Sequence, residues 1–230
     1  MSKQIQRRAW CGGLLGVGGA LCGAQLALGG ERRRPTGLIR TPRLSNTDFY
    51  TAGKFNPEAA KSAYLVLMDQ LGYPHSPELA KTLFVTDFGL GQFLDVGLGI
   101  QMWVNDQKAN YTSLDMCLLP NQMIPEHWHV AVEAEKIPAK MESWLVRYGV
   151  SYTYGEGPAT SKIGVTIHES QKPFVTVLHE TRLGVGQVTG ISKPLEKHWQ
   201  QAGPEGAVVS EFSTYHSGAA VRFTDPKIKF

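Results

Sequence analysis

The length, composition and charge of this chain of 230 residues exclude several classes of protein. Hydrophobic residues make up 42% of it, which supports one substantial core and argues against a disordered chain. The net charge of +3 is uneven, because residues 1–43 hold eight Lys/Arg and one acidic residue, leaving 15 basic and 19 acidic residues to the remainder. We therefore expect no nucleic-acid partner for the body of the chain. Two of the three cysteines lie in residues 1–30, which leaves one in the body and excludes a disulfide framework, and none has the C-x-x-C spacing of a zinc site.

Residues 1–30 have the features of an export signal. Residues 9–29 are uncharged and rich in glycine, and they follow Arg7 and Arg8 directly. This pattern is typical of a cleavable signal, and the paired arginines resemble the twin-arginine type. We expect an exported protein, periplasmic or extracellular, that has no membrane association after cleavage. Two alternatives stay open: an uncleaved anchor, and a mis-assigned start that would leave the protein cytoplasmic.

Residues 31–83 are expected to form a linker and a helical arm. Asn56 can cap a helix that begins at Pro57, and Gly72 would end it. Between them, apolar residues recur at the helical spacing and predict one buried stripe. A second, short helix is expected from Pro77 to about residue 83, capped by Ser76.

From residue 84 onward the pattern changes to short strands. Segments rich in β-branched and aromatic residues alternate with Gly, Pro, Asn or Asp, without any intervening helical period. This organisation is typical of a sandwich or barrel, so we expect a mainly β domain over 84–230 with a helical preface. The expected strands include segments around 84–88, 111–119, 142–155, 162–169, 174–181 and 207–216.

An H-x-H motif at His127 and His129 is the first candidate for chemistry. Residues i and i+2 of a strand share a face, so both imidazoles would lie on one side, about 7 Å apart along the chain. Glu142 begins the next strand pattern, in which Trp144, Val146 and Tyr148 should share its face. Two imidazoles and a carboxylate suit a divalent metal ion. The alternative is a chance pair of surface histidines.

Three later residues are further candidates. His198 follows a turn-rich segment, and it would complete a His₃Glu ligand set if its strand returns beside His127. Glu211 lies in an otherwise apolar strand and is either solvent-facing or held in a polar cavity, a choice that strand parity leaves open. His216 could line a pocket.

These residues resemble the first motif of the cupins, G-x5-H-x-H-x(3,4)-E-x6-G. The match runs from Asn121 through the H-x-H motif and Glu142 to Gly149. Asn121 replaces the first glycine, which its tolerance of left-handed backbone angles allows. Twelve residues, instead of three or four, separate His129 from Glu142, so a longer hairpin must be accommodated. The resemblance implies a cupin fold, a double-stranded β-helix or jelly-roll barrel.

More specifically, the chain is similar to the D-lyxose isomerase branch of the cupins. The matching stretches are residues 85–98, 125–129, 140–144, 198–214 and 222–228. The resemblance implies a divalent metal ion, usually Mn²⁺ (with Zn²⁺, Co²⁺ or Fe²⁺ as alternatives), held by His127, His129, Glu142 and His198. A family-typical acidic residue is replaced by Met141, which puts the charge around the site, and with it the substrate preference, in question.

The activity implied is aldose–ketose isomerisation, of D-lyxose to D-xylulose or of D-mannose to D-fructose, through a metal-stabilised cis-enediol. Glu211 is the candidate for proton transfer, Lys140 for an acid or electrostatic partner, and Arg222 for a substrate contact. Because dimers are common among cupins, the resemblance also allows a homodimer. Two alternatives remain, a metal-dependent cupin oxygenase and an exported sugar-binding cupin without catalysis.

Overall fold

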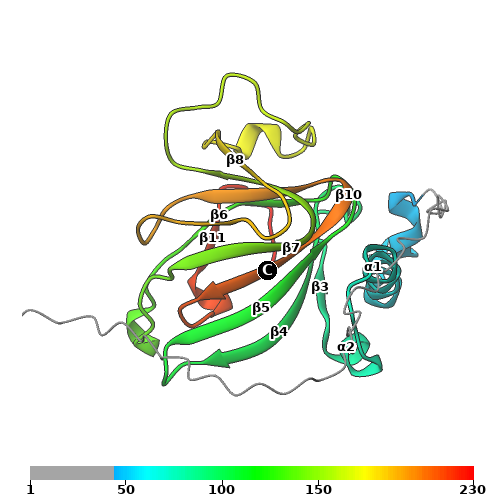
Figure 1. The fold of residues 1–230 in the computed structure, drawn as a ribbon, viewed down its shortest axis with the longest axis horizontal. Helices are drawn as coiled ribbons and strands as arrows, with labels where there is room; N and C mark the ends of the chain where they lie inside the picture. The colour runs from blue at the N-terminus through cyan, green and yellow to red at the C-terminus, as the bar shows by residue number, and fades with distance from the viewer. Residues whose placement is uncertain (1–43) are drawn as a thin grey trace, which may run out of the picture. The chain divides into compact units, whose positions relative to one another are not determined.

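The structure is a computed structural model that describes residues 44–230. The leader and most of the linker expected at residues 1–43 lie outside these residues. One antiparallel sheet of nine strands curls into a half-barrel, and the helices pack on one side of it (Figure 1). The mainly β class and the cupin-like barrel with a helical preface are thus confirmed. The elements are η1 (Asn46–Phe49), β1 (Tyr50–Thr51), β2 (Lys54–Phe55), α1 (Pro57–Leu71), α2 (Pro77–Thr82), β3 (Phe84–Thr86), β4 (Leu98–Asp106), β5 (Tyr111–Leu118), β6 (Met123–His129), η2 (Glu133–Glu135), β7 (Glu142–Gly155), η3 (Lys172–Phe174), β8 (His179–Leu183), β9 (Val188–Gly190), β10 (His198–Ser213), η4 (Gly218–Ala220) and β11 (Val221–Phe223).

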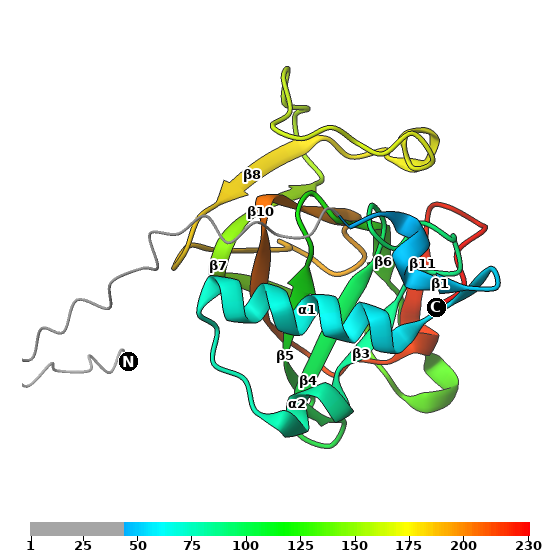
Figure 2. The same ribbon diagram turned by 90° about the vertical axis from the view of Figure 1, so that its right-hand side faces the viewer.

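Helix α1 has the ends that its sequence predicts. The Asn56 side chain accepts a hydrogen bond from the Ala59 amide at 3.3 Å, and Gly72 adopts a left-handed conformation with φ 68°. The helix lies across the outer face of the sheet (Figure 2), where Tyr64 and Met68 pack in a cluster that includes Cys117 and Val208. The apolar stripe therefore covers the barrel from outside. Helix α2 also forms, although the Ser76 side chain makes no cap hydrogen bond.

The long strand β10 organises the sheet. Its first residues, His198–Gln201, pair with β6 on one side, and its second half, Ala207–Ser213, pairs with β5 on that side. Along its other edge it pairs with β7 over most of its length. This register places His198 opposite His127, and Glu211 beside Trp144. One strand therefore carries groups to both ends of the same inner face.

Of the four residues expected to share one face of β7, three do so and the fourth does not. Glu142, Trp144 and Val146 are buried on the inner face. The register with β10 shifts between Val146 and Tyr148, so the bulge at Arg147 reverses the alternation. As a result Tyr148 lies on the outer side, where its ring meets Tyr73 edge-on with centroids 5.5 Å apart.

The strand expected at residues 162–169 does not form, and the one expected at 174–181 is reduced to β8, which begins at His179. The segment before β8 is instead held by the buried carboxylate of Glu126. It accepts hydrogen bonds from the amides of Thr176 (2.5 Å) and Val177 (3.0 Å) and from the Thr224 hydroxyl (2.6 Å). Because a side chain takes these backbone donors, no strand ladder is needed here. The segment crosses one end of the barrel (Figure 1).

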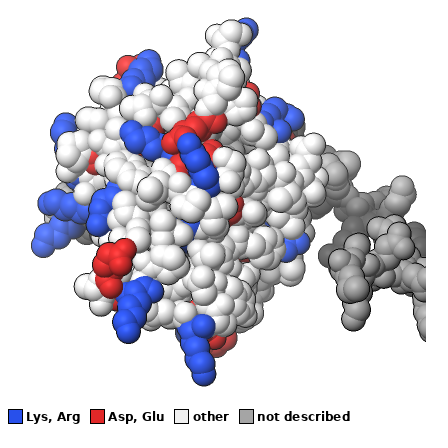
Figure 3. Space-filling model, turned by 90° about the vertical axis from the view of Figure 1, so that its left-hand side faces the viewer, with Lys and Arg blue, Asp and Glu red and all other residues white. Residues whose placement is uncertain are grey.

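The surface and helices of the described residues add two observations. On the face drawn in Figure 3, positive and negative side chains are interspersed among uncharged ones. Between residues 44 and 230, no helix is long and apolar enough to span a membrane.

Candidate metal centre and active site

Four side chains converge on the inner face of the barrel. One ligand atom from each lies within 4.8 Å of the others, and three of the four residues are fully buried. Strand β6 supplies two of them, and β7 and β10 each supply their first residue. The four are His127, His129, Glu142 and His198. The structure therefore brings together the complete predicted ligand set.

The hairpin between β6 and β7 accommodates the long spacing. Val132 and Ile137 exchange backbone hydrogen bonds of 2.9 and 3.1 Å around the single turn of η2. Lys136 closes this turn in a left-handed conformation with φ 56°. The extra residues form a small turn of their own, so Glu142 still enters β7 beside the two histidines.

Two of the imidazoles are held in one tautomer. His127 Nδ1 lies 2.8 Å from the Pro125 carbonyl, and His198 Nδ1 lies 2.9 Å from the Glu196 carbonyl. A carbonyl only accepts, so in the neutral form of each ring Nδ1 carries the proton and Nε2 can present a lone pair to the cluster. Such hydrogen bonds are the usual support of metal-binding histidines.

The residues fit a divalent metal ion. His198 Nε2 lies 2.9 Å from Glu142 Oε2, and His129 Nε2 lies 3.2 Å from Glu142 Oε1. Within residues 44–230, these two nitrogens and Glu142 Oε2 are buried without a hydrogen-bond partner. Buried polar atoms are rarely left in this state, and an ion between them would resolve it. Three imidazole nitrogens and a carboxylate oxygen suit a borderline cation such as Zn²⁺, Mn²⁺, Co²⁺ or Fe²⁺.

The electrostatics of the cluster favour the metal-binding protonation states of His127 and Glu142, but not that of His198. Burial, together with the neighbouring His198 and His129, lowers the pKa of His127 well below its ordinary value. Burial alone would raise the pKa of Glu142, but Lys140, His129 and His198 together outweigh burial and hold that pKa well below the usual range. For His198 the attraction of Glu142 overcomes burial and raises the pKa. Metal binding should therefore displace a proton from the His198–Glu142 pair.

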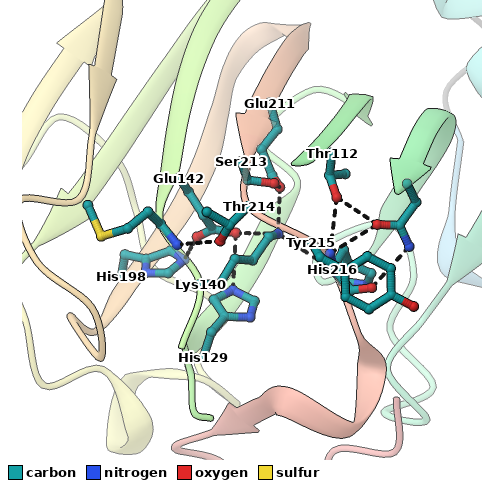
Figure 4. A network of polar contacts seen from close by, with 12 residues as sticks. Thr112, His129, Lys140, Glu142, His198, Glu211, Ser213, Thr214, Tyr215 and His216 are labelled. Atoms are coloured by element: carbon teal, nitrogen blue, oxygen red, sulfur yellow. Dashed lines mark hydrogen bonds and ion pairs between the residues drawn. The ribbon is translucent and has the colours of Figure 1, made fainter. Parts of the chain in front are cut away.

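Lys140 and Glu211 form a second polar group beside the ligands (Figure 4). Lys140 Nζ lies 2.6 Å from Glu142 Oε1 and 2.5 Å from Glu211 Oε1. Burial lowers the pKa of Lys140, but the two carboxylates more than reverse this and raise it, so the side chain is an ammonium. The Ser213 hydroxyl also donates to Glu211 Oε1 at 2.8 Å. Parity on β10, which the sequence leaves open, places Glu211 inside.

A narrow cavity of about 40 Å³ connects these groups. Its polar wall contains the four ligands with Lys140 and Glu211, and its apolar wall includes Phe88, Phe223 and Phe230. Gln200 and His216 also line it. Sequence reasoning missed Gln200, although the period of two from His198 along β10 was a usable signal. Such a cavity can position a small polar molecule against a metal ion and exclude bulk water.

Arg222 lies elsewhere. It alternates with the cavity-lining residues Val221 and Phe223 on β11, so its side chain points away from the cavity. Its guanidinium donates to the carbonyls of Ala219 (2.8 Å) and Val221 (2.7 Å) at the surface. The structure does not bring Arg222 to the cavity, unlike the other candidate residues.

Comparison with known proteins gives the following relatives. No family model matches the chain. It is 38% identical over 154 residues to the D-lyxose/D-mannose isomerase of Thermosediminibacter oceani, covering 67% of this chain and 82% of that protein. It is 34% identical over 170 residues to the D-lyxose ketol-isomerase of Cohnella laeviribosi, covering 74% of this chain and 91% of that protein.

Solved structures show a similar fold. An L-ribose isomerase of Cellulomonas parahominis superposes with a TM-score of 0.56 at 16% identity, covering 74% of this chain and 91% of that chain. An L-ribose isomerase of Acinetobacter sp. DL28 in complex with L-ribose superposes with a TM-score of 0.52 at 15% identity, covering 74% and 92%. At these identities the likeness concerns the fold alone.

Proposed function

This chain belongs to the D-lyxose ketol-isomerase family, and we propose that it is a metal-dependent aldose–ketose isomerase. The proposed reaction is D-lyxose to D-xylulose, or D-mannose to D-fructose, with Mn²⁺ as the resident ion. One observation carries the proposal: a His₃Glu ligand set and a separate buried carboxylate, Glu211, face one cavity. Metal binding alone would not require this second carboxylate.

The ligands would be His127, His129, Glu142 and His198. The bound ion would supply Lewis-acid chemistry, polarising the carbonyl oxygen of an open-chain sugar and its neighbouring hydroxyl. The His127 and His198 rings are already fixed by their carbonyl partners, so little reorganisation is needed on binding.

Glu211 would carry the proton that moves between C2 and C1 of the sugar. Its carboxylate takes the proton from C2 of the aldose to give a cis-enediol and delivers a proton to C1, either the same proton or one exchanged with solvent on Glu211, while a hydroxyl proton passes from O2 to O1. Atoms and electrons balance within the substrate, so no co-reactant is required. The ammonium of Lys140 and the Ser213 hydroxyl both hold Glu211 Oε1, which leaves Oε2 available for the proton.

Lys140 would act electrostatically. Its ammonium lies between the ligand Glu142 and the base Glu211 and is almost completely buried. A fixed positive charge in a site of low dielectric stabilises negative charge that develops on substrate oxygens. The apolar wall of Phe88, Phe223 and Phe230 would strengthen this effect by excluding water.

Hydrogen–deuterium exchange tests the proposal. The full chain is stripped with a chelator, reloaded with Mn²⁺ and incubated in deuterated water with D-lyxose or D-mannose. The sugars are then analysed by proton NMR after removal of protein and ion. We expect ketose formation with deuterium at the exchanged carbon, lost in the chelated sample. Tight metal binding without any exchange would contradict the proposal, and oxygen uptake with Fe²⁺ would favour an oxygenase.

We also propose that residues 1–30 direct export. The proposal is supported by Arg7 and Arg8 in front of the uncharged segment. Changing both to lysine should retain the protein in the cytoplasm, as measured by cell fractionation, whereas Lys3→Arg should leave export intact. Equal export of both variants would contradict a twin-arginine signal.

A further inference from the structure

His216 is a partly buried side chain of the cavity to which the mechanism above gives no role. It follows β10 in the chain, and its ring lines the cavity 6.5 Å, between ring centroids, from His129. Its backbone is held firmly, because its N–H lies 3.0 Å from both Asn105 Oδ1 and Thr112 Oγ1. The Asn105 amide in turn donates to the His216 carbonyl at 3.0 Å. The position of this ring is therefore fixed by two neighbouring strands, β4 and β5.

The hydrogen bonds of Lys140 show whether its ammonium can still donate to a bound sugar. An ammonium has three N–H donors. Those of Lys140 point to Glu142 Oε1 at 2.6 Å, Glu211 Oε1 at 2.5 Å and His216 Nδ1 at 3.4 Å (Figure 4). All three donors have partners, so Lys140 has none left for a sugar oxygen unless one of these contacts breaks.

The same contacts fix the tautomer of His216. Because Nδ1 accepts from an ammonium, the ring proton lies on Nε2. No residue of the described chain accepts a hydrogen bond from this Nε2–H. Burial, with a contribution from the Lys140 charge, lowers the pKa of His216 to about 3, so the ring is neutral near pH 7. A neutral ring with a free donor thus remains on the cavity wall.

We propose that His216 is a substrate-contacting residue that donates its Nε2–H to an oxygen of the polyol or sugar bound in the cavity. Asn105 and Thr112 act as positioning residues that hold the ring in place. The inference rests on the proposed function and adds a specificity contact to it. An open-chain sugar carries an oxygen on every carbon, so a donor beyond the chelated pair can select the orientation of a further hydroxyl.

Three substitutions separate a substrate contact from a structural role. His216→Phe removes both nitrogens and keeps the ring. His216→Asn places an amide near the position of Nδ1, where it can accept from Lys140, but it does not reach the position of Nε2. His216→Gln places an amide N–H near Nε2. His75→Phe is the matched control, because His75 pairs with Asp69 outside the cavity.

The measurement is calorimetric binding of D-arabinitol, the unreactive alditol of D-lyxose, to the Mn²⁺-loaded full chain, with metal content, KM and kcat determined in parallel. We expect His216→Phe and His216→Asn to weaken alditol binding and raise KM about tenfold at unchanged metal content. His216→Gln should recover most of the affinity, and His75→Phe should equal the wild type.

Two results would overturn the inference. One is wild-type affinity in both the Phe and the Asn variants. The other is affinity in the Asn variant that is restored as well as in the Gln variant, which would mean that only the contact with Lys140 matters. A wild-type protein that binds metal but neither binds alditol nor exchanges sugar would instead refute the proposed function, so the two failures are distinguishable.

Discussion

The ammonium nitrogen of Lys140 lies 2.5 Å from Oε1 of Glu211, although the two residues are 71 positions apart in the chain. Both side chains are buried, and a buried carboxylate without a counter-charge is costly. The pair therefore lets the fold keep a carboxylate inside a largely apolar cavity. It also joins the candidate base to the metal ligand Glu142, which Lys140 contacts at 2.6 Å.

Replacing Glu211 by Gln should abolish isomerisation while metal content stays unchanged. The amide preserves the shape but cannot take a proton, and general-base catalysis of this kind contributes about 10²–10⁴-fold in rate. Deuterium incorporation and metal analysis check the two parts separately. Glu205→Gln, at an exposed position within β10 where its pairing with β7 is irregular, is the control. Full activity in Glu211→Gln would remove Glu211 from the mechanism.

Chelation should lower the melting temperature of the wild type and have little effect on His198→Ala. A ligand that binds only the folded state stabilises it by mass action, by about 2.7 kcal/mol at 100 times its dissociation constant. His198→Ala removes one of four ligands and the proton that metal binding displaces. Thermal unfolding with and without Mn²⁺ tests this, with His75→Ala as control. An equal response of His198→Ala and wild type would contradict the assignment.

The metal-free protein should lose stability between pH 7 and pH 5, in part through His216. Its pKa is about 3 when folded, lowered by burial and Lys140, and about 6.5 when unfolded. Between these values only the unfolded chain binds the proton, so stability falls as pH decreases. By pH 5 this group alone should cost about 2 kcal/mol.

Urea unfolding at both pH values measures this loss in wild type and in His216→Gln. The variant should lose about 2 kcal/mol less, since glutamine does not titrate. Any effect of the other buried groups is common to both proteins and cancels in the difference. Identical pH dependence would show that His216 takes up its proton over the same pH range in the folded protein as in the unfolded chain.

Gly149→Ala should destabilise the protein strongly. Gly149 has φ +73°, and a Cβ there would lie 2.0 Å from the carbonyl oxygen of Gly206 on β10. Gly186 has a similar φ of +81° with no atom within 4 Å of such a Cβ. Gly186→Ala should therefore cost only the conformational term of about 1–2 kcal/mol, and Gly149→Ala more than about 3 kcal/mol. Equal losses in chemical denaturation would mean that the β7–β10 contact relaxes easily.

Local patterns predicted much of this molecule correctly. The ends of α1 follow from Asn56, Pro57 and Gly72, because capping depends on a few neighbouring atoms. The same holds for the two imidazoles of H-x-H, which share a face by the geometry of any strand. Asn121 does adopt the left-handed conformation, φ 60°, that replaces the glycine of the cupin motif.

Two predictions from the sequence were wrong because they depend on how strands pair in the folded protein. Tyr148 lies on the outer face because one extra residue bulges out of β7, and no local signal marks that position. Residues 162–169 form no strand, although their composition favours one. β-Propensity measures how well a side chain fits a half-buried surface, and here the partner strand is absent from the described fold.

The sequence by itself determined the class of the fold, the helical arm and the types of ligand, since these depend on periodicity, capping and donor chemistry. Tertiary structure alone decided that His198 lies opposite His127, that Glu211 points inward, and that Lys140 and His216 meet beside it. Those relationships depend on strand register and parity over separations of 71 residues or more. A shift of one residue in β10 would turn His198 and Glu211 to the other face of the sheet.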